Sequence, residues 1–201
     1  QARKEINLFA ERMRRMFGML KTLLHETNEN EFNKLFSRIE KYENISDSME
    51  LEIANYLNKV SEGRLSSESK LEIRGMLREV TEIESIGDSC YNLARTINRK
   101  RSGGNDFTEK QYEHIHQMMQ LTDDALAQMI AIVEDDYHVV DVNKTFNLEN
   151  EINNYRAQLK NQNVVDVNNK EYDYQMGVHY MDLIGECEKL GDYVVNVVEA
   201  R

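Results

Sequence analysis

The chain has 201 residues, which is enough for one large domain or two small ones. Its formal net charge of −11 argues against a general nucleic-acid-binding protein, because such proteins carry a basic surface. The longest apolar stretches are only a few residues long, so no segment is expected to span a bilayer. Proline is absent, glycine is scarce and methionine is common, a composition that favours helices around an adaptable core.

The first predicted helix covers residues 2–27, where apolar side chains recur at helical spacing. This helix is locally basic, because residues 1–21 hold six Lys or Arg against two Glu in an otherwise acidic chain. Two interpretations of this charge stay open. Either the basic residues pair with acidic neighbours inside the fold, or the helix lies beside a membrane that contains anionic lipids.

The second predicted helix covers residues 31–61. Its apolar positions alternate three and four residues apart over four heptads, as in long packed helices. Glu43 and Asp47 lie four residues apart, just off this apolar stripe. A glycine at position 63 ends the helix. Ser66 or Ser67 then caps the third predicted helix, which runs to about residue 101.

A polar linker at residues 102–106 divides the chain near its midpoint. The fourth predicted helix follows Thr108, which is expected to form a capping box with the glutamine three residues on. The fifth covers residues 142–160, with Glu149 and Asn153 beside its apolar stripe. Residues 161–170 are predicted to form a polar loop docked on the bundle. The sixth helix is predicted to cover residues 171–200.

One acidic phrase occurs twice, in the third and the sixth predicted helices. Glu84 and Asp88 flank a glycine in the first copy, and Glu188 and Asp192 repeat this arrangement 104 residues later. The flanking residues agree as well, since Glu82 corresponds to Glu186 and Asn92 to Asn196. The acidic spacing of the second helix recurs on the fifth at an offset of 106 residues. A period of about half the chain indicates two equivalent modules.

The repeated spacing places two acidic side chains on one face of a helix. Like charges at this spacing destabilise an isolated helix by about 0.2–0.5 kcal/mol, and a glycine costs about 1 kcal/mol more than alanine in a helix interior. A multivalent cation held between the carboxylates would turn their repulsion into attraction. The alternative interpretation is a solvated acidic face, with Gly87 and Gly191 serving close helix packing.

The sequence therefore predicts an all-α protein made of two tandem antiparallel three-helix bundles, over residues 1–102 and 106–201. Short loops would make the second and third helices of each bundle neighbours. Two carboxylate pairs could then supply about four oxygen ligands to a hard or borderline cation. The candidate metal ligands are Glu43, Asp47, Glu84 and Asp88 in the first bundle and Glu149, Asn153, Glu188 and Asp192 in the second.

The two copies of the Glu-x-x-Gly-Asp phrase, each followed by Asn92 or Asn196, resemble the repeated signature of the PhoU family. The acidic spacings on the second and fifth helices match its other motif. This resemblance implies six helices in two three-helix bundles, with iron or zinc clusters, or another divalent cation, bound by the acidic motifs at the surface. Asn153 departs from the pattern, so the second half would bind metal with one charge fewer.

The resemblance also implies a regulatory, non-catalytic role in phosphate homeostasis. Free-standing members of the family regulate a phosphate ABC transporter and its sensor kinase, whereas others are cytoplasmic tails of sodium/phosphate cotransporters. The absence of an initiator Met and the basic first helix are similar to the tail version, which lies at the inner face of the cell membrane. The expected partner is a membrane phosphate transporter, either the chain's own transmembrane domain or a transport complex. A homodimer is a further expectation, and nucleic acid is not.

Two other functions stay open. A di-iron carboxylate enzyme would need Glu-x-x-His on two helices, and only Glu113 and His116 supply this spacing. A structural adaptor with solvated acidic faces would bind no metal. Cys90 and Cys187 fall on apolar stripes, so both are predicted to be buried free thiols.

Overall fold

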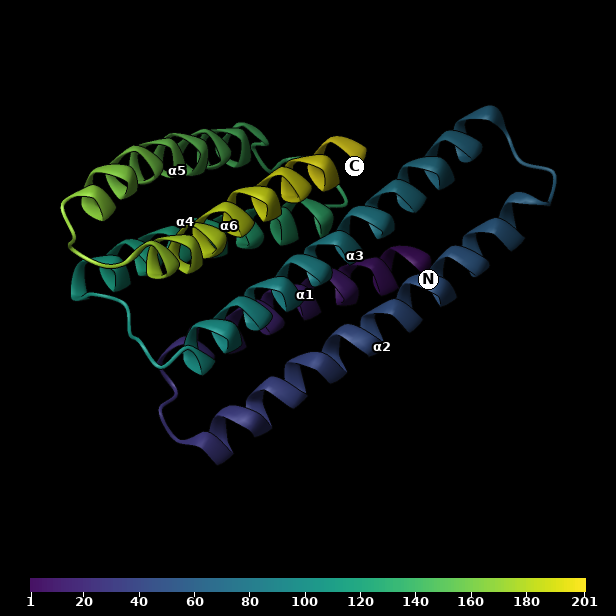
Figure 1. The fold of residues 1–201 in the computed structure, drawn as a ribbon. Coiled ribbons are helices and arrows are strands. Elements are labelled where there is room, and N and C mark those ends of the chain that lie inside the picture. Colours follow the sequence, from purple (N-terminus) through teal and green to yellow (C-terminus); the bar gives the residue numbers. More distant parts are fainter.

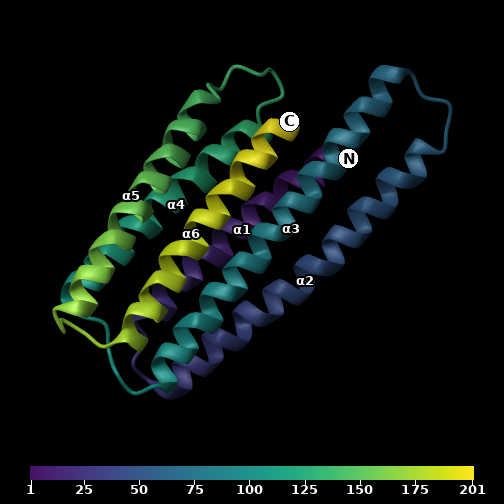
Figure 2. The same cartoon turned by 45° about the horizontal axis from the view of Figure 1, so that its top comes forward.

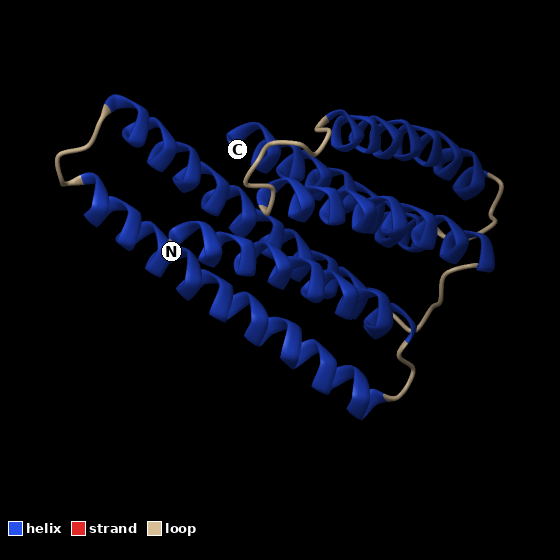
Figure 3. Ribbon diagram, turned by 180° about the vertical axis from the view of Figure 1, so that it is seen from behind, coloured by secondary structure: helices blue, strands red, loops and turns tan.

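The computed structural model describes residues 1–201, and all of its regular elements are helices (Figure 3). In chain order they are α1 (Ala2–His25), α2 (Glu29–Ser61), α3 (Ser67–Ser102), α4 (Glu109–Val133), α5 (Asn143–Asn168) and α6 (Tyr174–Ala200). The prediction of an all-α fold with six helices is confirmed. No helix combines the length and the hydropathy that a membrane span requires.

Side-chain caps set the start of four of the helices. Asn28, Ser66, Thr108 and Asp173 each accept a hydrogen bond from the backbone N–H three residues further on. Thr108 and Gln111 form the predicted capping box, with both hydrogen bonds present. A cap of this kind contributes about 1 kcal/mol to stability, so each short polar connection also fixes the helix that follows it.

The end of α5 differs from the prediction. Residues 161–170 are not a docked loop, because α5 continues through most of them to Asn168. This part of α5 packs closely on α6. A Cβ atom on Gly177 would lie 2.9 Å from Cγ2 of Val167 and 3.1 Å from Oδ1 of Asn163. The polar composition suggested a loop, but a tertiary contact with α6 keeps the segment helical.

The six helices form two joined bundles (Figure 1). Helices α1–α3 pack on one another, as do α4–α6, and the pairs α3–α6 and α1–α4 connect the two sets. Consequently α2 and α5 lie on opposite outer sides (Figure 2). One cluster of 41 buried apolar residues runs through both bundles. The bundles therefore share a core, and independent folding of residues 1–102 and 106–201 stays a prediction.

Reciprocal hydrogen bonds join α3 to α6, the two helices that carry the repeated phrase. The side-chain amide of Asn92 donates to Oε1 of Glu186 at 3.2 Å, and that of Asn196 donates to Oε2 of Glu82 at 3.2 Å. Each bond is the repeat equivalent of the other, with donor and acceptor helices exchanged. The pairing is antiparallel and relates the two halves by a local twofold axis.

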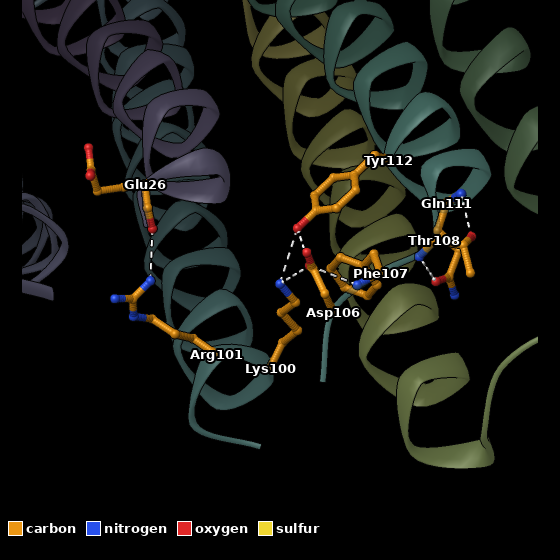
Figure 4. Close-up of polar contacts among 8 residues, drawn as sticks. All are labelled: Glu26, Lys100, Arg101, Asp106, Phe107, Thr108, Gln111 and Tyr112. Carbon is orange, nitrogen blue, oxygen red and sulfur yellow. Dashed lines mark hydrogen bonds and ion pairs between the residues drawn. The ribbon is translucent and has the colours of Figure 1, made fainter. Parts of the chain in front are cut away.

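Polar contacts hold the connection between the bundles (Figure 4). Nζ of Lys100 donates to Oδ1 of Asp106 at 2.5 Å and to the hydroxyl of Tyr112 at 3.1 Å. The guanidinium of Arg101 donates to the backbone carbonyl of Glu26 at 2.8 Å, which is one of the acceptors left free at the end of α1. The end of α3 is thereby tied to both α1 and α4.

Some of the basic side chains of α1 form ion pairs with acidic residues of other helices. The guanidinium of Arg3 lies 2.8 Å from the fully buried carboxylate of Glu79 on α3. Arg14 and Lys21 lie 3.3 and 3.5 Å from the carboxylate of Asp123 on α4. Three of the basic side chains thus pair with acidic neighbours, in line with the first interpretation of this helix.

The connection between α2 and α3 lies at the tip of a hairpin that extends beyond the other four helices (Figures 1 and 2). Only two helices are present there, so little apolar surface can be covered. Near the tip, Val60 and Leu71 are 39% and 63% exposed.

Candidate metal centre

Four carboxylates meet between α2 and α3. Glu43 and Asp47 come from α2, and Glu84 and Asp88 come from α3; one oxygen of each lies within 4.8 Å of the others. Ligands on opposite sides of a cation are about 4–5 Å apart when each metal–oxygen bond is 2.0–2.6 Å. We refer to these four residues as the α2–α3 carboxylate group. No other set of three or more potential metal ligands in the chain converges in this way.

The packing beneath the group brings the two helices together. Ser46, which lies between the two acidic residues of α2, is buried, and its hydroxyl donates to the carbonyl of Tyr42 at 2.7 Å. On α3, a Cβ atom on Gly87 would lie 3.2 Å from Sδ of Met13 on α1. The small residues therefore let α1 support both helices from below, while the carboxylates stay at the outer edge.

The carboxylates are crowded and form no ion pair, although the charge of Arg95 partly offsets the rise in the pKa of Glu43. Burial raises the pKa of Glu84 to about 9, helped by a hydrogen bond to Asp47 and by the charge of Asp88. Burial raises the pKa of Glu43 to about 7, helped by a hydrogen bond to Asp88 and by the charge of Asp47. None of the four forms an ion pair. A bound divalent cation would supply the missing positive charge, so the residues present fit a metal.

A polar pocket of about 500 Å³ opens beside the group. Its lining comprises Glu40, Glu43, Asn44, Asp88, Tyr91, Asn92 and Arg95. The hydroxyl of Tyr91 donates to Oε2 of Glu40 at 2.7 Å, and the guanidinium of Arg95 donates to Oδ1 of Asn92. The pocket gives ions and water access to the carboxylates. Its mostly polar lining makes it unsuited to a hydrophobic ligand.

The donor set consists of oxygen atoms alone, without histidine or cysteine. Carboxylate oxygens suit hard and borderline divalent cations, and structural zinc sites are built more often from sulfur and nitrogen. The chemistry of the group therefore matches iron, manganese, magnesium or calcium well, and zinc with carboxylate ligands.

The second half does not form an equivalent group. The amide of Asn153 donates to Oε1 of Glu149 at 3.1 Å on α5. Nε of Arg156 lies 3.5 Å from Oε1 of Glu188. Burial raises the pKa of Asp192 to about 6, helped by a hydrogen bond to Glu149. The structure thus brings the first four predicted ligands together and pairs the other four differently.

Arg156 was not among the residues predicted from the sequence. The offset of 106 that relates Glu149 to Glu43 also relates Arg156 to Glu50, so a comparison of α2 with α5 would have found it. Glu50 lies near the α2–α3 carboxylate group: burial raises its pKa, and the charges of Asp47 and Asp88 add to this shift.

The histidines do not form the di-iron arrangement that stayed open. Nε2 of His116 on α4 faces Nε2 of His25 on α1, and neither these nor Glu113 belongs to a group of three potential ligands. Nδ1 of His114 lies 2.8 Å from the hydroxyl of Tyr180. Both cysteines are buried and free, as predicted.

A second cavity, of about 410 Å³, lies where α1 and α3 end. Its cations are Lys100 and Arg101, which already contact Asp106 and the last carbonyls of α1. The cavity therefore has no unpaired positive charge for an anion.

Solved structures of known proteins share this fold. The chain matches the phosphate transport system regulatory protein PhoU from Streptococcus pneumoniae with a TM-score of 0.78 and 15% identity, over 99% of this chain and 90% of the other. It matches PhoU from Pseudomonas aeruginosa with a TM-score of 0.75 and 15% identity, over 99% and 92%. A PhoU-like protein from Shewanella oneidensis MR-1 matches with a TM-score of 0.79 and 16% identity, over 100% and 96%.

The comparison with curated proteins found no match. At identities of 15–16% the structural matches establish the fold alone. The PhoU domain, however, matches the sequence twice, over residues 6–97 and 115–200, and these two ranges make up most of the chain. Each copy contains one of the repeated acidic phrases. The chain therefore belongs to the PhoU domain family.

Proposed function

We propose that this protein is a metal-binding regulator of phosphate transport. The observation that carries the proposal is the match of the PhoU domain to both halves of the chain. It is supported by the fold shared with a phosphate transport system regulatory protein. The role is regulatory, and no catalytic residue is assigned.

The metal part of the proposal rests on the α2–α3 carboxylate group. Glu43, Asp47, Glu84 and Asp88 would hold iron or zinc, or another divalent cation. The cation would supply the positive charge that the crowded carboxylates lack. The side chains of α2 and α3 would then share one partner, so metal binding would tie the outer helix α2 to α3.

Metal binding can be tested with a double variant, Glu84→Gln with Asp88→Asn. Protein purified without chelator is subjected to elemental analysis and then titrated with Zn²⁺, and with Fe²⁺ under anaerobic conditions. We expect stoichiometric metal in the wild type and its loss in the variant. The matched control, Glu52→Gln with Glu72→Gln, removes two exposed carboxylates from the same helices and should keep the metal. Metal-free wild-type protein that also fails to bind either ion, and Mn²⁺, Mg²⁺ and Ca²⁺ in the same titration, would refute this part.

Two settings for the regulator follow from different observations. The basic charge of α1 includes Lys4 and Arg15, which form no ion pair, and this favours a cytoplasmic tail of a sodium/phosphate cotransporter beside anionic lipid. The nearly complete coverage of the solved PhoU chains, 90–96%, favours a free-standing regulator of a phosphate ABC transporter and its sensor kinase.

An immunoblot of fractionated cells separates the two settings. A tail would appear in the membrane fraction at a mass well above 23.6 kDa, the mass of this chain, and protease would reach it only from the cytoplasmic face. A free-standing regulator would run near 23.6 kDa. In either setting, uptake of labelled phosphate should change when Glu84→Gln and Asp88→Asn are introduced together. Unchanged uptake in this variant and in a deletion strain would contradict the regulatory role.

A further inference from the structure

Corresponding positions on α2 and α5 carry opposite charges. Glu50 lies three residues after Asp47 on α2, and Arg156 lies three residues after Asn153 on α5. Residues three and four apart share a helix face, so both side chains belong to the face that carries the candidate ligands. In the first half, α2 and α3 together present five carboxylates. At the equivalent positions of the second half, α5 and α6 present three carboxylates, one amide and one guanidinium.

The guanidinium of Arg156 is directed at the acidic residues of its own half. Its Nε lies 3.5 Å from Oε1 of Glu188. This nitrogen is buried and has no hydrogen-bond partner, and Glu188 is the one acidic residue with which Arg156 forms an ion pair. Arg156 comes from α5 and Glu188 from α6, which are the repeat equivalents of the two helices that form the α2–α3 carboxylate group.

The first half has no such contact. Glu43, Asp47, Glu50, Glu84 and Asp88 form no ion pair. Arg95 lines the neighbouring pocket, but its guanidinium donates to the side chain of Asn92 and lies over the ring of Tyr91, 5.2 Å from its centre. The charge of Arg95 partly offsets the rise in the pKa of Glu43, but the two halves differ in whether a guanidinium forms an ion pair with the acidic residues.

We infer that Arg156 takes the place of the metal in the second half, so that the chain has one metal site and one permanent ion pair at equivalent positions of its two repeats. A cation bound by Glu188 would have to displace the guanidinium or lie beside it, and Asn153 offers it no charge. This inference rests on the proposed function for the metal site between α2 and α3. On this inference the second site binds no metal, and its ion pair only stabilises the packing of α5 on α6.

The metal-dependent test exchanges the charges between the halves. The variant Asn153→Asp with Arg156→Glu gives the second half the acidic residues of the first, and titration with Zn²⁺ should show a second site that the wild type lacks. The reverse variant, Asp47→Asn with Glu50→Arg, should lose the site of the wild type. Glu188→Gln with Asp192→Asn should leave the Zn²⁺ stoichiometry of the wild type unchanged.

A metal-free test keeps the inference separate from the proposed function. In the presence of EDTA, Arg156→Gln should lower Tm by about 2–4 °C, because it leaves a half-buried carboxylate unpaired. Glu50→Arg should raise Tm in EDTA, since it supplies the first half with the missing cation. Arg78→Gln is the matched control: its partner Glu199 is also on α6, but both side chains are about half exposed at 3.7 Å, and little change is expected.

The outcomes can be told apart. If Glu84→Gln with Asp88→Asn removes only part of the bound Zn²⁺ and the remainder is lost on adding Glu188→Gln, both halves bind metal, so the inference is wrong while the proposed site between α2 and α3 stands. If the wild type binds no metal but Arg156→Gln lowers Tm in EDTA, the proposed metal site is wrong, while the stabilising ion pair of Arg156 with Glu188 is supported. If Arg156→Gln behaves like Arg78→Gln, Arg156 has no such role and the inference fails.

Discussion

Asn92 on α3 and Glu186 on α6 form a hydrogen bond of 3.2 Å whose repeat equivalent, between Asn196 and Glu82, is formed in the opposite sense. These four positions belong to the repeated phrase, yet they lie in the interface between the halves and not in the metal group. The phrase therefore serves two purposes. Its Glu-x-x-x-Asp residues face α2 or α5, and its flanking residues join α3 to α6.

We expect Asn92→Ala to destabilise the protein by about 1 kcal/mol or more, because the variant removes the hydrogen bond to the carboxylate of Glu186 and also the exposed one that Asn92 accepts from Arg95. Tm should fall by about 2–4 °C for a chain of this size. Asn98→Ala on the same helix is the control: it makes the same gain in helix propensity, and no hydrogen bond of its side chain is lost. Equal Tm values for the two variants would show that the interface does not depend on this bond.

The stability of the metal-free protein should depend on pH through Glu84. Its pKa is raised from an ordinary value of 4.5 to about 9, so between these values the folded state binds more protons than the unfolded state. The contribution of this group to stability is therefore present below pH 4.5 and is lost as pH rises towards 9. Thermal melts of wild type and Glu84→Gln in EDTA check this.

The two melting temperatures should agree near pH 5 and diverge towards pH 9, where the variant becomes the more stable protein. Zn²⁺ should reverse the order at high pH, since metal binds the ionised carboxylates of the wild type. Glu52→Gln, an exposed position on α2, controls for the loss of a surface charge. A constant difference between wild type and Glu84→Gln across this range would contradict the assignment.

The contact between His25 on α1 and His116 on α4 should make the joint between the bundles sensitive to acid. Burial and the charge of His116 lower the pKa of His25 below 6.5. The unfolded chain then binds more protons than the folded chain near this pH, so the contribution to stability is complete above 6.5 and is lost as pH falls below it. His25→Gln should flatten the dependence of Tm on pH between 5 and 7. His138→Gln, at an exposed loop position, should not.

Close packing of α5 on α6 should make Gly177 intolerant of a side chain. A Cβ atom there would lie 2.9 Å from Val167 and 3.1 Å from Asn163, so Gly177→Ala should lower Tm despite the better helix propensity of alanine. Gly18→Ala is the matched control, because nothing lies within 4 Å of its Cβ position on α1. This control should gain about 1 kcal/mol. A gain at both positions would mean that α5 does not pack here as described.

The helices could be predicted because their signals are local. Apolar spacing, the Thr108 capping box and the glycine-containing breaks all act within a few residues, and the structure places six helices accordingly. The end of α5 was predicted wrongly for the same reason. Its polar residues give no local signal for a helix, and the contact of Val167 with Gly177 that holds it depends on α6.

The part of the candidate site formed by repeated acidic residues could be predicted from the sequence. Residues whose roles depend on a contact with a residue distant in the sequence could not. The spacing of acidic residues was sufficient to place Glu84 and Asp88 opposite α2. It could not reveal that Asn92 bonds across the molecule, because that contact joins residues 94 positions apart. Arg156 was visible in principle, since the offset relates it to Glu50, but only a search for opposite charges at equivalent positions would have singled it out.

The tip of the hairpin formed by α2 and α3 should have a lower local stability than the rest of the protein. Beyond the reach of the other helices, its backbone hydrogen bonds are shielded from water by only one neighbouring helix. Amide protons near residues 60–70 will therefore exchange with solvent sooner than those of the α3 segment beside α6, through local opening that leaves the rest of the fold intact. Because the tip opens so readily, the C-terminal end of α2 can move while its N-terminal part stays packed on the bundle.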